Sequence, residues 1–155
     1  MTIRLANEND IDSILDLLSQ VLELHYNLRP DLFVKGKTKY DKTTLKSMLN
    51  DINKHIYVAI ENDKLIGYCF CIIKENKADN HIANSKTLYI DDLCVDKEYR
   101  SKHIGQNILD YIKEEAKRLN ADYITLNVWE GNDTAKLFYE HNGFKIRKTE
   151  MEYKV

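Results

Sequence analysis

The sequence predicts one domain of the α/β (mixed α+β) class, built around a single sheet. Segments with strand-like patterns and segments with a helical period follow one another in the order β α α β β β α β α β. A strand–helix–strand unit over residues 88–128 has the form of a right-handed parallel crossover. The 155 residues contain no repeat, linker or low-complexity tract, so we expect a single domain over residues 1–155.

The N-terminal part is predicted to hold one strand, two helices and a loop between the helices. Thr2 to Leu5 is a short apolar strand, and Asn7 or Asn9 can cap the helix that follows. That helix keeps its period through Ile11, Ile14, Leu15, Leu18, Val21 and Leu22. Pro30 and Gly36 then break regular structure, which predicts a loop. A second short helix is marked by Leu45, Met48, Leu49 and Ile52.

A β-hairpin is predicted in the middle of the chain. The two runs from His55 to Glu61 and from Lys64 to Lys74 are rich in β-branched and aromatic residues. Asn62 and Asp63, between them, are typical of a tight hairpin turn. Residues 75–86 are polar and are expected to link the hairpin to the next strand.

The segment from Leu88 to Leu109 is the centre of the predicted functional region. It combines a strand (residues 88–95), a polar turn (residues 96–103) and a helix that opens at Ile104 or Gly105. The first backbone N–H groups of such a helix have no helical acceptor, and the positive end of the helix dipole lies behind them. The turn is therefore predicted to bind the pyrophosphate of a nucleotide-like cofactor.

The C-terminal part completes the predicted fold. Tyr123 to Val128 is a buried strand, and a short helix from Thr134 to His141 is ended by Asn142 and Gly143. Residues 144–155 are predicted to form one or two strands. Because the apolar positions there change parity, we expect a bulge or turn near Lys148.

Composition excludes several classes of function. A net charge of −2 and a pI of about 6.2 give no general attraction to nucleic acid. No signal peptide and no apolar run long enough to cross a membrane is present, so we expect a cytoplasmic protein without a membrane partner. Cys69 and Cys71 lack the spacing of a metal or redox motif, and core packing with no metal is expected.

Two motifs in the second half of the chain resemble those of a known enzyme family. Arg100-Ser101-Lys102-His103-Ile104-Gly105 is similar to the pattern Q/R-x-x-G-x-G/A, with His103 where glycine is usual. The second pattern, N-x-x-A-x-x-x-Y-x-x-x-G-F, is matched by Asn132, Ala135, Tyr139, Gly143 and Phe144. Together they resemble the GNAT superfamily of N-acetyltransferases, and the likeness in element order extends over nearly the whole chain.

The resemblance implies a fold and a cosubstrate. The fold would be a GNAT-like domain with a mostly antiparallel twisted sheet, helices on both faces, and a parallel β-α-β unit at the cofactor site. Acetyl-CoA would be bound without a metal. The pantetheine arm would meet the backbone of Leu93, Cys94 and Val95, and also Asn132 and Ala135. The pyrophosphate would meet the amides of Arg100, Ser101, Lys102, His103, Ile104, Gly105 and Gln106.

The resemblance also implies catalytic roles. An alkylamine must lose a proton before it attacks a thioester, and Asp91 stands where several members of the family carry a carboxylate base. Asp92 faces the other side of a regular strand, and it is the alternative if a bulge shifts the pleat. Tyr139 would lie near the sulfur and donate to the departing thiolate. Cys94 is expected to offer its backbone rather than a nucleophilic thiol, so the amine would attack directly.

The acceptor is left open by the sequence. A loop predicted between the first two helices would cover the acceptor pocket, and with the end of the fifth strand it contributes the candidates His25, Tyr26, Arg29, Phe33, Asn127 and Trp129. Glu23, Asp31 and Asp41 are either ligands of a cationic amine or ordinary surface charges. A small primary amine is the first expectation, a protein N-terminus or lysine the second, and a non-catalytic acyl-CoA sensor the third. A homodimer is also expected.

Overall fold

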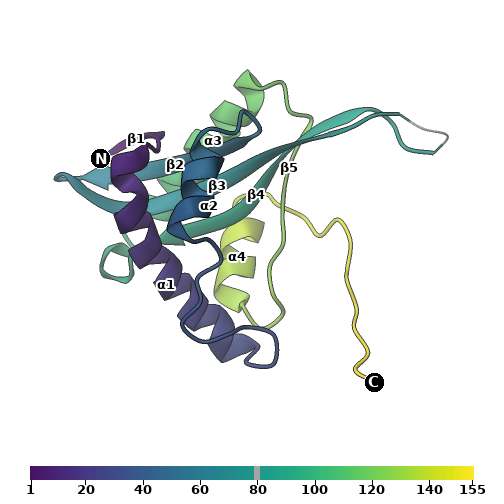
Figure 1. The fold of residues 1–155 in the computed structure, drawn as a ribbon. Helices are drawn as coiled ribbons and strands as arrows, with labels where there is room; N and C mark the ends of the chain where they lie inside the picture. Colours follow the sequence, from purple (N-terminus) through teal and green to yellow (C-terminus); the bar gives the residue numbers. More distant parts are fainter. Residues whose placement is uncertain (79–80) are drawn as a thin grey trace.

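The computed structural model describes residues 1–78 and 81–155 of the chain and contains one five-stranded sheet (Figure 1). The strands lie in the order β1-β2-β3-β4-β5, with bounds Thr2–Leu5, Lys54–Glu61, Lys64–Asn76, Ser85–Val95 and Tyr123–Leu126. The first three neighbouring pairs are antiparallel, and β4 pairs with β5 in parallel. The predicted fold class, with its mostly antiparallel sheet and its parallel crossover, is confirmed.

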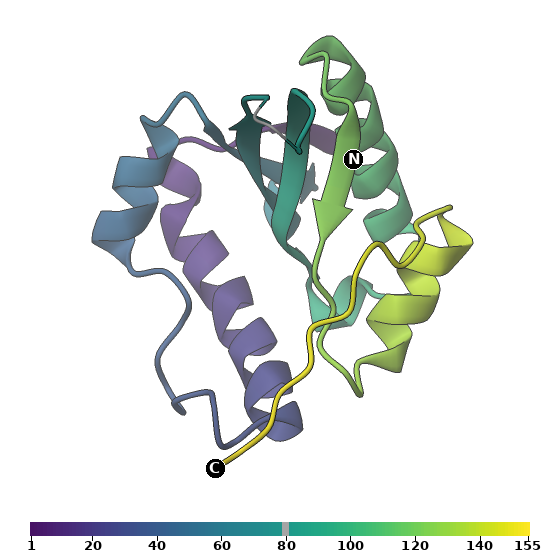
Figure 2. The same cartoon turned by 90° about the vertical axis from the view of Figure 1, so that its right-hand side faces the viewer.

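Helices cover both faces of this sheet, and each face has its own apolar core. Helices α1 (Ile11–Leu28) and α2 (Lys42–Leu49) lie on one face, and α3 (Ile104–Arg118) and α4 (Asp133–His141) lie on the other (Figure 2). The first core packs α1 and α2 on alternate side chains of β2 and β3, among them Tyr68 and Phe70. The second packs α3 on the opposite side chains, among them Cys69 and Cys71. The period-2 pattern of the strands therefore decides which helices each residue meets.

Helix α1 begins where the sequence predicted but extends further. The Asn7 side chain accepts from the N–H of Asn9, and the Asp10 carboxylate accepts from the N–H of Asn7, in a capping box before the helix. The helix continues to Leu28. His25 and Tyr26, which were predicted to lie on a loop, are therefore on the last turns of α1. Polar residues interrupt the apolar period there, although none of them breaks a helix.

The β2–β3 hairpin is confirmed, including its turn. Asn62 and Asp63 have φ values of 49° and 60°, as a tight hairpin turn of primed type requires. Gly67 on β3 has a role that the sequence did not indicate. A Cβ atom at this position would lie 2.9 Å from the carbonyl oxygen of Cys94 and 2.9 Å from a methyl carbon of Ile108. The glycine lets α3 and β4 pack closely on β3.

Three predicted boundaries are wrong. The second helix is Lys42–Leu49, so Ile52 lies outside it and is 84% exposed. The polar link predicted at residues 75–86 is shorter at both ends, because β3 runs to Asn76 and β4 begins at Ser85; Asp79 and Asn80 lie outside the described residues. The strand β5 ends at Leu126, before the predicted Val128.

The predicted C-terminal strands are absent. No strand is assigned within residues 144–155, which leave α4 and extend away from the sheet (Figure 1). Apolar Ile146 and Met151 are 72% and 90% exposed there. The bulge expected near Lys148 is therefore also wrong. Alternating apolar residues suffice for a strand only when a neighbouring strand supplies hydrogen bonds, and this segment pairs with no described strand.

Candidate active site

A β-bulge in β4 brings the two aspartates of the predicted site to the same face of the sheet. In the register with β3, Phe70 pairs with Asp92 and Cys71 pairs with Ile90, so Asp91 is the extra residue. Ile90 packs in the core beneath α3, whereas both carboxylates meet groups on the α1 side. A regular strand would have put Asp91 and Asp92 on opposite faces. The bulge on which Asp92 depended as the alternative base is therefore present in the structure.

Asp91 is held by two residues of the loop between α1 and α2. The Tyr40 hydroxyl donates to Asp91 Oδ2 at 2.5 Å. Lys39 Nζ lies 2.8 Å from the same oxygen and donates to the Asp91 backbone carbonyl at 3.1 Å. The Asp91 side chain is only 11% exposed. Burial, and then the hydrogen bond to Asp91, raise the pKa of Tyr40, so its phenol stays protonated and donates.

Asp92 is the more deeply buried of the two carboxylates. The Tyr68 hydroxyl donates to Asp92 Oδ2 at 2.9 Å. Burial raises the pKa of Asp92 to about 6, although the hydrogen bond from Tyr68 and the Lys39 ammonium act in the opposite direction. A carboxyl group whose pKa is close to neutral is suited to exchange protons at physiological pH.

Strand β4 extends beyond its parallel pairing with β5. The last paired residues of β4 and β5 are Ile90 and Leu126, so Asp91 is the first residue of β4 beyond the pairing. After β5 the chain descends to α4 (Figure 2). Ligands of parallel sheet units bind beyond the carboxyl ends of the strands, and this is that end. Leu93, Cys94 and Val95 lie on the part of β4 that extends past β5.

Tyr139 of α4 packs beside the end of this pairing. Its ring contacts Phe138 and Phe144, with centroids 5.1 and 5.5 Å away. Burial raises the pKa of Tyr139, and the neighbouring Cys69 and Asp92 raise it further. The phenol is therefore a neutral donor at physiological pH.

The turn from β4 to α3 presents free backbone N–H groups, as predicted. The first helical bond of α3 runs from the N–H of Asn107 to the carbonyl of His103 at 3.0 Å, so the amides of residues 104–106 have no helical acceptor. Ser101 and His103 adopt φ values of 60° and 59°. The position where the motif usually has glycine thus has the left-handed backbone that glycine favours, although a histidine occupies it.

Basic side chains surround this turn. Arg100, Lys102 and His103 are exposed, and the Arg100 Nε donates to the carbonyl of Val95 at 3.2 Å. Tyr99 precedes Arg100 on this turn, and the ammonium groups of Lys64 and Lys102 each lie 4.9 Å from the centre of its ring. An anion at the amides of α3 would therefore meet positive charge as well as the helix dipole.

The thiol of Cys94 faces away from this turn. It is buried on the α1 side and lies 3.8 Å from the carbonyl oxygen of Leu17. Burial raises the pKa of Cys94 to about 12. A thiol in this state is a poor nucleophile at neutral pH, which agrees with the backbone role expected from the sequence.

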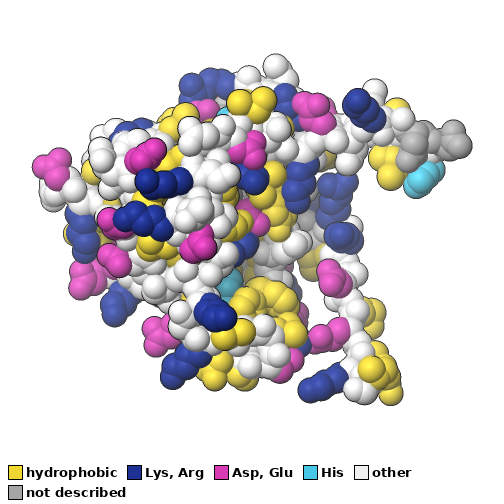
Figure 3. Space-filling view, in the orientation of Figure 1, with side chains coloured by type: hydrophobic (Ala, Val, Ile, Leu, Met, Phe, Trp, Pro, Cys, Tyr) yellow, Lys and Arg dark blue, Asp and Glu magenta, His cyan; other side chains and the backbone are white. Residues whose placement is uncertain are grey.

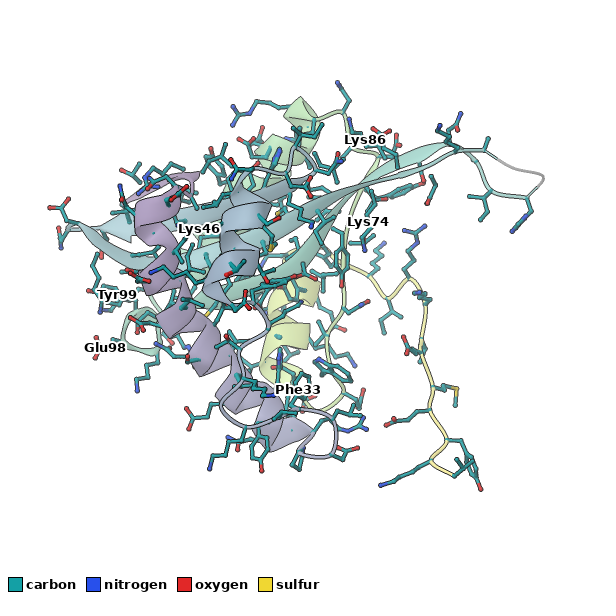
Figure 4. All side chains as sticks on the ribbon, viewed as in Figure 1. Phe33, Lys46, Lys74, Lys86, Glu98 and Tyr99 are labelled. Carbon is teal, nitrogen blue, oxygen red and sulfur yellow. The ribbon has the colours of Figure 1, made fainter. Side chains whose placement is uncertain are left out.

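Three of the predicted acceptor-side residues form one aromatic cluster. His25 stacks on Phe33 at 5.1 Å, and Phe33 meets Trp129 edge-to-face at 5.4 Å. Phe33 lies between the end of α1 and α4 (Figure 4). Apolar side chains gather over the loop that follows α1 (Figure 3), where Leu32 and Val34 are 51% and 61% exposed. Burial, together with the Lys39 ammonium, lowers the pKa of His25, so its ring is neutral at physiological pH.

The other acceptor candidates are engaged elsewhere. Arg29 pairs with Asp31 and with Glu152 of the C-terminal segment, at 2.8 and 2.6 Å. Asp41 caps α2 by accepting from the N–H of Thr44. Tyr26 is half-buried on α1, and Glu23 is exposed there. The Asn127 side chain donates to the Tyr89 hydroxyl at 3.2 Å.

Two residues of the second motif, and Gln106 directly after the first motif, have structural contacts. The Asn132 side-chain oxygen accepts from the N–H of Ala135 at 3.3 Å and caps α4. Gln106 Nε2 donates to Asn142 Oδ1 at 2.6 Å and so connects α3 to the end of α4. One lone pair of the Asn132 carboxamide oxygen is therefore used, and the other lone pair and the N–H₂ group remain for a ligand.

Sequence reasoning missed the partners of the aspartates. Lys39, Tyr40 and Tyr68 bond Asp91 or Asp92, yet none of them belongs to a recognised motif. The only signal was their residue types, a lysine and a tyrosine in a loop predicted to cover the acceptor side.

Among the described residues, no group of three or more His, Cys, Asp or Glu side chains is arranged to bind a metal ion. Within residues 1–78 and 81–155, no helix has the length and apolarity needed to cross a membrane.

Comparison with known proteins identifies relatives over most of the chain. Residues 21–144 match the model of the Acetyltransferase (GNAT) family. N-alpha-acetyltransferase 30 of Schizosaccharomyces pombe is 30% identical over 105 residues, which are 68% of this chain and 67% of the relative. The uncharacterized N-acetyltransferase YhfO of Bacillus subtilis is 28% identical and covers 94% of this chain and 90% of its own. The crystal structure of a mutant of the BH1408 protein from Bacillus halodurans superposes with a TM-score of 0.96, at 29% identity over 100% of this chain and 99% of that chain.

Proposed function

Because the chain belongs to the Acetyltransferase (GNAT) family, we propose that it transfers an acetyl group from acetyl-CoA to a primary amine of a small molecule by direct attack. Family membership and the named relatives support an acyltransferase. The observation that carries the proposal is the end of the β4–β5 pairing at Ile90 and Leu126, beside two carboxylates and a protonated tyrosine. A thioester bound at this place would lie near a candidate base and a candidate acid.

The cosubstrate would be bound mainly by backbone groups. The pyrophosphate would accept from the N–H groups of the turn and of the first residues of α3, residues 100–106, near exposed Arg100 and Lys102. The pantetheine arm would run along residues 93–95 of β4 and past Asn132 and Ala135 of α4. A backbone N–H of this part of β4 would polarise the thioester carbonyl and stabilise the oxyanion that forms on it.

The reaction would then proceed through one tetrahedral intermediate. Asp91 would take a proton from the acceptor ammonium, directly or through water, and the neutral amine would attack the thioester carbon. When the intermediate collapses, the C–N bond is kept and the C–S bond breaks. Tyr139 would donate its proton to the leaving thiolate, and the attacking nitrogen would lose its second proton to water, from which Tyr139 recovers its own. The proton on Asp91 would pass to solvent. Asp91 is proposed as the base because its carboxylate already holds an ammonium group, that of Lys39, at 2.8 Å.

Release of CoA from acetyl-CoA tests this proposal. The full chain would be assayed with polyamines, aminoglycosides, amino acids and short peptides as acceptors. We expect release with at least one amine class, and we expect Asp91→Asn to remove the rise of the rate with pH. If only Asp92→Asn does so, Asp92 is the base. Binding of acetyl-CoA without CoA release from any acceptor would instead support the non-catalytic sensor.

A protein N-terminus is the second candidate acceptor. It is favoured by the similarity to N-alpha-acetyltransferase 30, whose name states that it acts on α-amino groups. Peptides that carry a free or a blocked N-terminus distinguish the candidates, as do peptides with and without lysine. A preference for the free N-terminus over every small amine would replace the small-molecule proposal.

We also propose that two copies of the chain associate through the C-terminal segment. Four exposed apolar residues there, Ile146, Met151, Tyr153 and Val155, have a strand-like pattern without a neighbouring strand, and β5 is an edge strand. Sedimentation should show a dimer that Met151→Lys weakens, and a wild-type monomer would contradict the proposal.

The three cysteines are free thiols, which fits the cytoplasm as the proposed location.

A further inference from the structure

The ammonium group of Lys39 lies where an acceptor amine would have to bind. Lys39 Nζ is 2.8 Å from Asp91 Oδ2 and donates to the Asp91 carbonyl at 3.1 Å. The lysine belongs to the loop between α1 and α2, 52 residues before Asp91 in the chain. Its side chain is 46% exposed, so it reaches the carboxylate from the solvent side and does not belong to the core.

The position of Asp91 makes this contact more than a surface ion pair. Asp91 is the first residue of β4 beyond its last pairing with β5, and residues 93–95, which follow it, are those proposed to align the thioester. The groups that contact Lys39 there are Asp91 and the ring of Tyr40, whose centre lies 5.6 Å from Nζ. A primary amine in this place is thus beside the proposed base and close to the proposed acyl donor.

We propose that Lys39 is a site of self-acetylation, at which the enzyme transfers an acetyl group from bound acetyl-CoA to its own Nζ. This inference rests on the proposed function. Asp91 takes a proton from the Lys39 ammonium, and the neutral Nζ attacks the thioester carbon. A C–N amide bond forms and the C–S bond breaks. CoA leaves as a thiol with the proton donated by Tyr139. The attacking nitrogen loses its second proton to water, from which Tyr139 recovers its own, and the proton on Asp91 passes to solvent.

Acetylation of Lys39 would change the site that it occupies. An acetylated lysine carries no charge and cannot form the ion pair with Asp91. The carboxylate of Asp91 would then be free to bind the ammonium group of another acceptor. The modification would also remove a positive charge that now lies near His25 and Asp92.

Peptide mass spectrometry with isotope-labelled acetyl-CoA tests the proposal. The full chain is incubated with the labelled cosubstrate and no added acceptor, and label is measured at each lysine over time. Lys35 and Lys37 are exposed members of the same loop and serve as internal controls. We expect Lys39 to be labelled roughly tenfold or more faster than either, because an amine held beside the thioester reacts at high effective concentration. Dilution of the protein over about a hundredfold range should leave the rate per molecule unchanged, as an intramolecular step requires.

Variants and a parallel assay separate the possible outcomes. Lys39→Arg should lose the label, whereas the matched Lys37→Arg variant should keep it at Lys39. Equal labelling of the three lysines, or the same labelling after heat denaturation, would mean chemical acetylation and would overturn the proposal. Absence of label at Lys39 while the acceptor panel releases CoA would overturn self-acetylation and leave the proposed function intact. If acetyl-CoA binds but neither label nor CoA release occurs, both are wrong.

Discussion

Replacing Asp92 by asparagine should stabilise the protein at neutral pH and not at acidic pH. Asp92 is a buried carboxyl group whose pKa is raised to about 6 from its ordinary value of 3.8. Asparagine has nearly the same shape, can still accept the hydrogen bond from Tyr68, and carries no charge to desolvate. The substitution therefore isolates the free-energy cost of holding a buried charge.

The magnitude follows from the two pKa values. The folded value of about 6 exceeds 3.8 by about two pKa units, and each unit corresponds to about 1.4 kcal/mol, so the cost is about 3 kcal/mol. Between these values the folded chain binds a proton that the unfolded chain has lost, and stability falls as pH rises. Below about pH 4 both states are protonated and the cost vanishes, whereas above about pH 6 it is complete.

Urea unfolding of wild type and Asp92→Asn from about pH 4 to about pH 8 measures this difference. The variant should be more stable by up to about 3 kcal/mol at neutral pH, and the advantage should disappear toward about pH 4. Asp16→Asn, which removes an exposed carboxylate from α1, is the control and should change stability only slightly. A difference for Asp92→Asn that does not depend on pH would refute the raised pKa.

Further predictions concern the packing, the turn and the proposed acid. Gly67→Ala should destabilise the chain by about 1–3 kcal/mol in urea unfolding, because the added Cβ would lie 2.9 Å from the backbone of β4. Gly105→Ala, whose added Cβ would have its nearest contact at 3.6 Å, should destabilise the chain much less. Equal destabilisation by the two substitutions would contradict the predicted clash at Gly67. His103→Gly should keep acetyl-CoA affinity in calorimetry, whereas His103→Val should weaken it, because a β-branched residue resists a φ of 59°. Tyr139→Phe should lower kcat by about tenfold to a hundredfold with little change in acetyl-CoA affinity, and an unchanged kcat would remove Tyr139 from the mechanism.

Most of the fold was predictable because its signals are local. The Asn62–Asp63 turn, the capping of α1 and the strand–turn–helix around Ile104 each depend on residues close in sequence. The predictions that were wrong do not follow from such local signals. Residues 144–155 have the alternating pattern of a strand, but they pair with no described strand. Alternation within one segment does not show whether a partner strand lies beside it. The last turns of α1 lack an apolar period, yet nothing in them ends a helix.

Several residues of the candidate site were named from the sequence, whereas their arrangement was not. Asp91, Asp92, Tyr139 and the turn before α3 were all named from residue type and motif spacing. Which way the two carboxylates point depends on a bulge, and a bulge is set by how β3 pairs with β4. No single-strand pattern contains that register.

The sequence by itself determined most of the order of elements, the mixed sheet, the turn before α3 and the residue types of the candidate site, because helical period, alternation and turn chemistry act over a few neighbouring residues. Only the tertiary structure decided what those residues meet. It brought Lys39 to Asp91 across 52 positions, put Tyr68 beneath Asp92, and buried that carboxyl group deeply enough to raise its pKa to about 6. Burial and ion pairing are properties of distance in space, and the chain sets those distances only when it has folded.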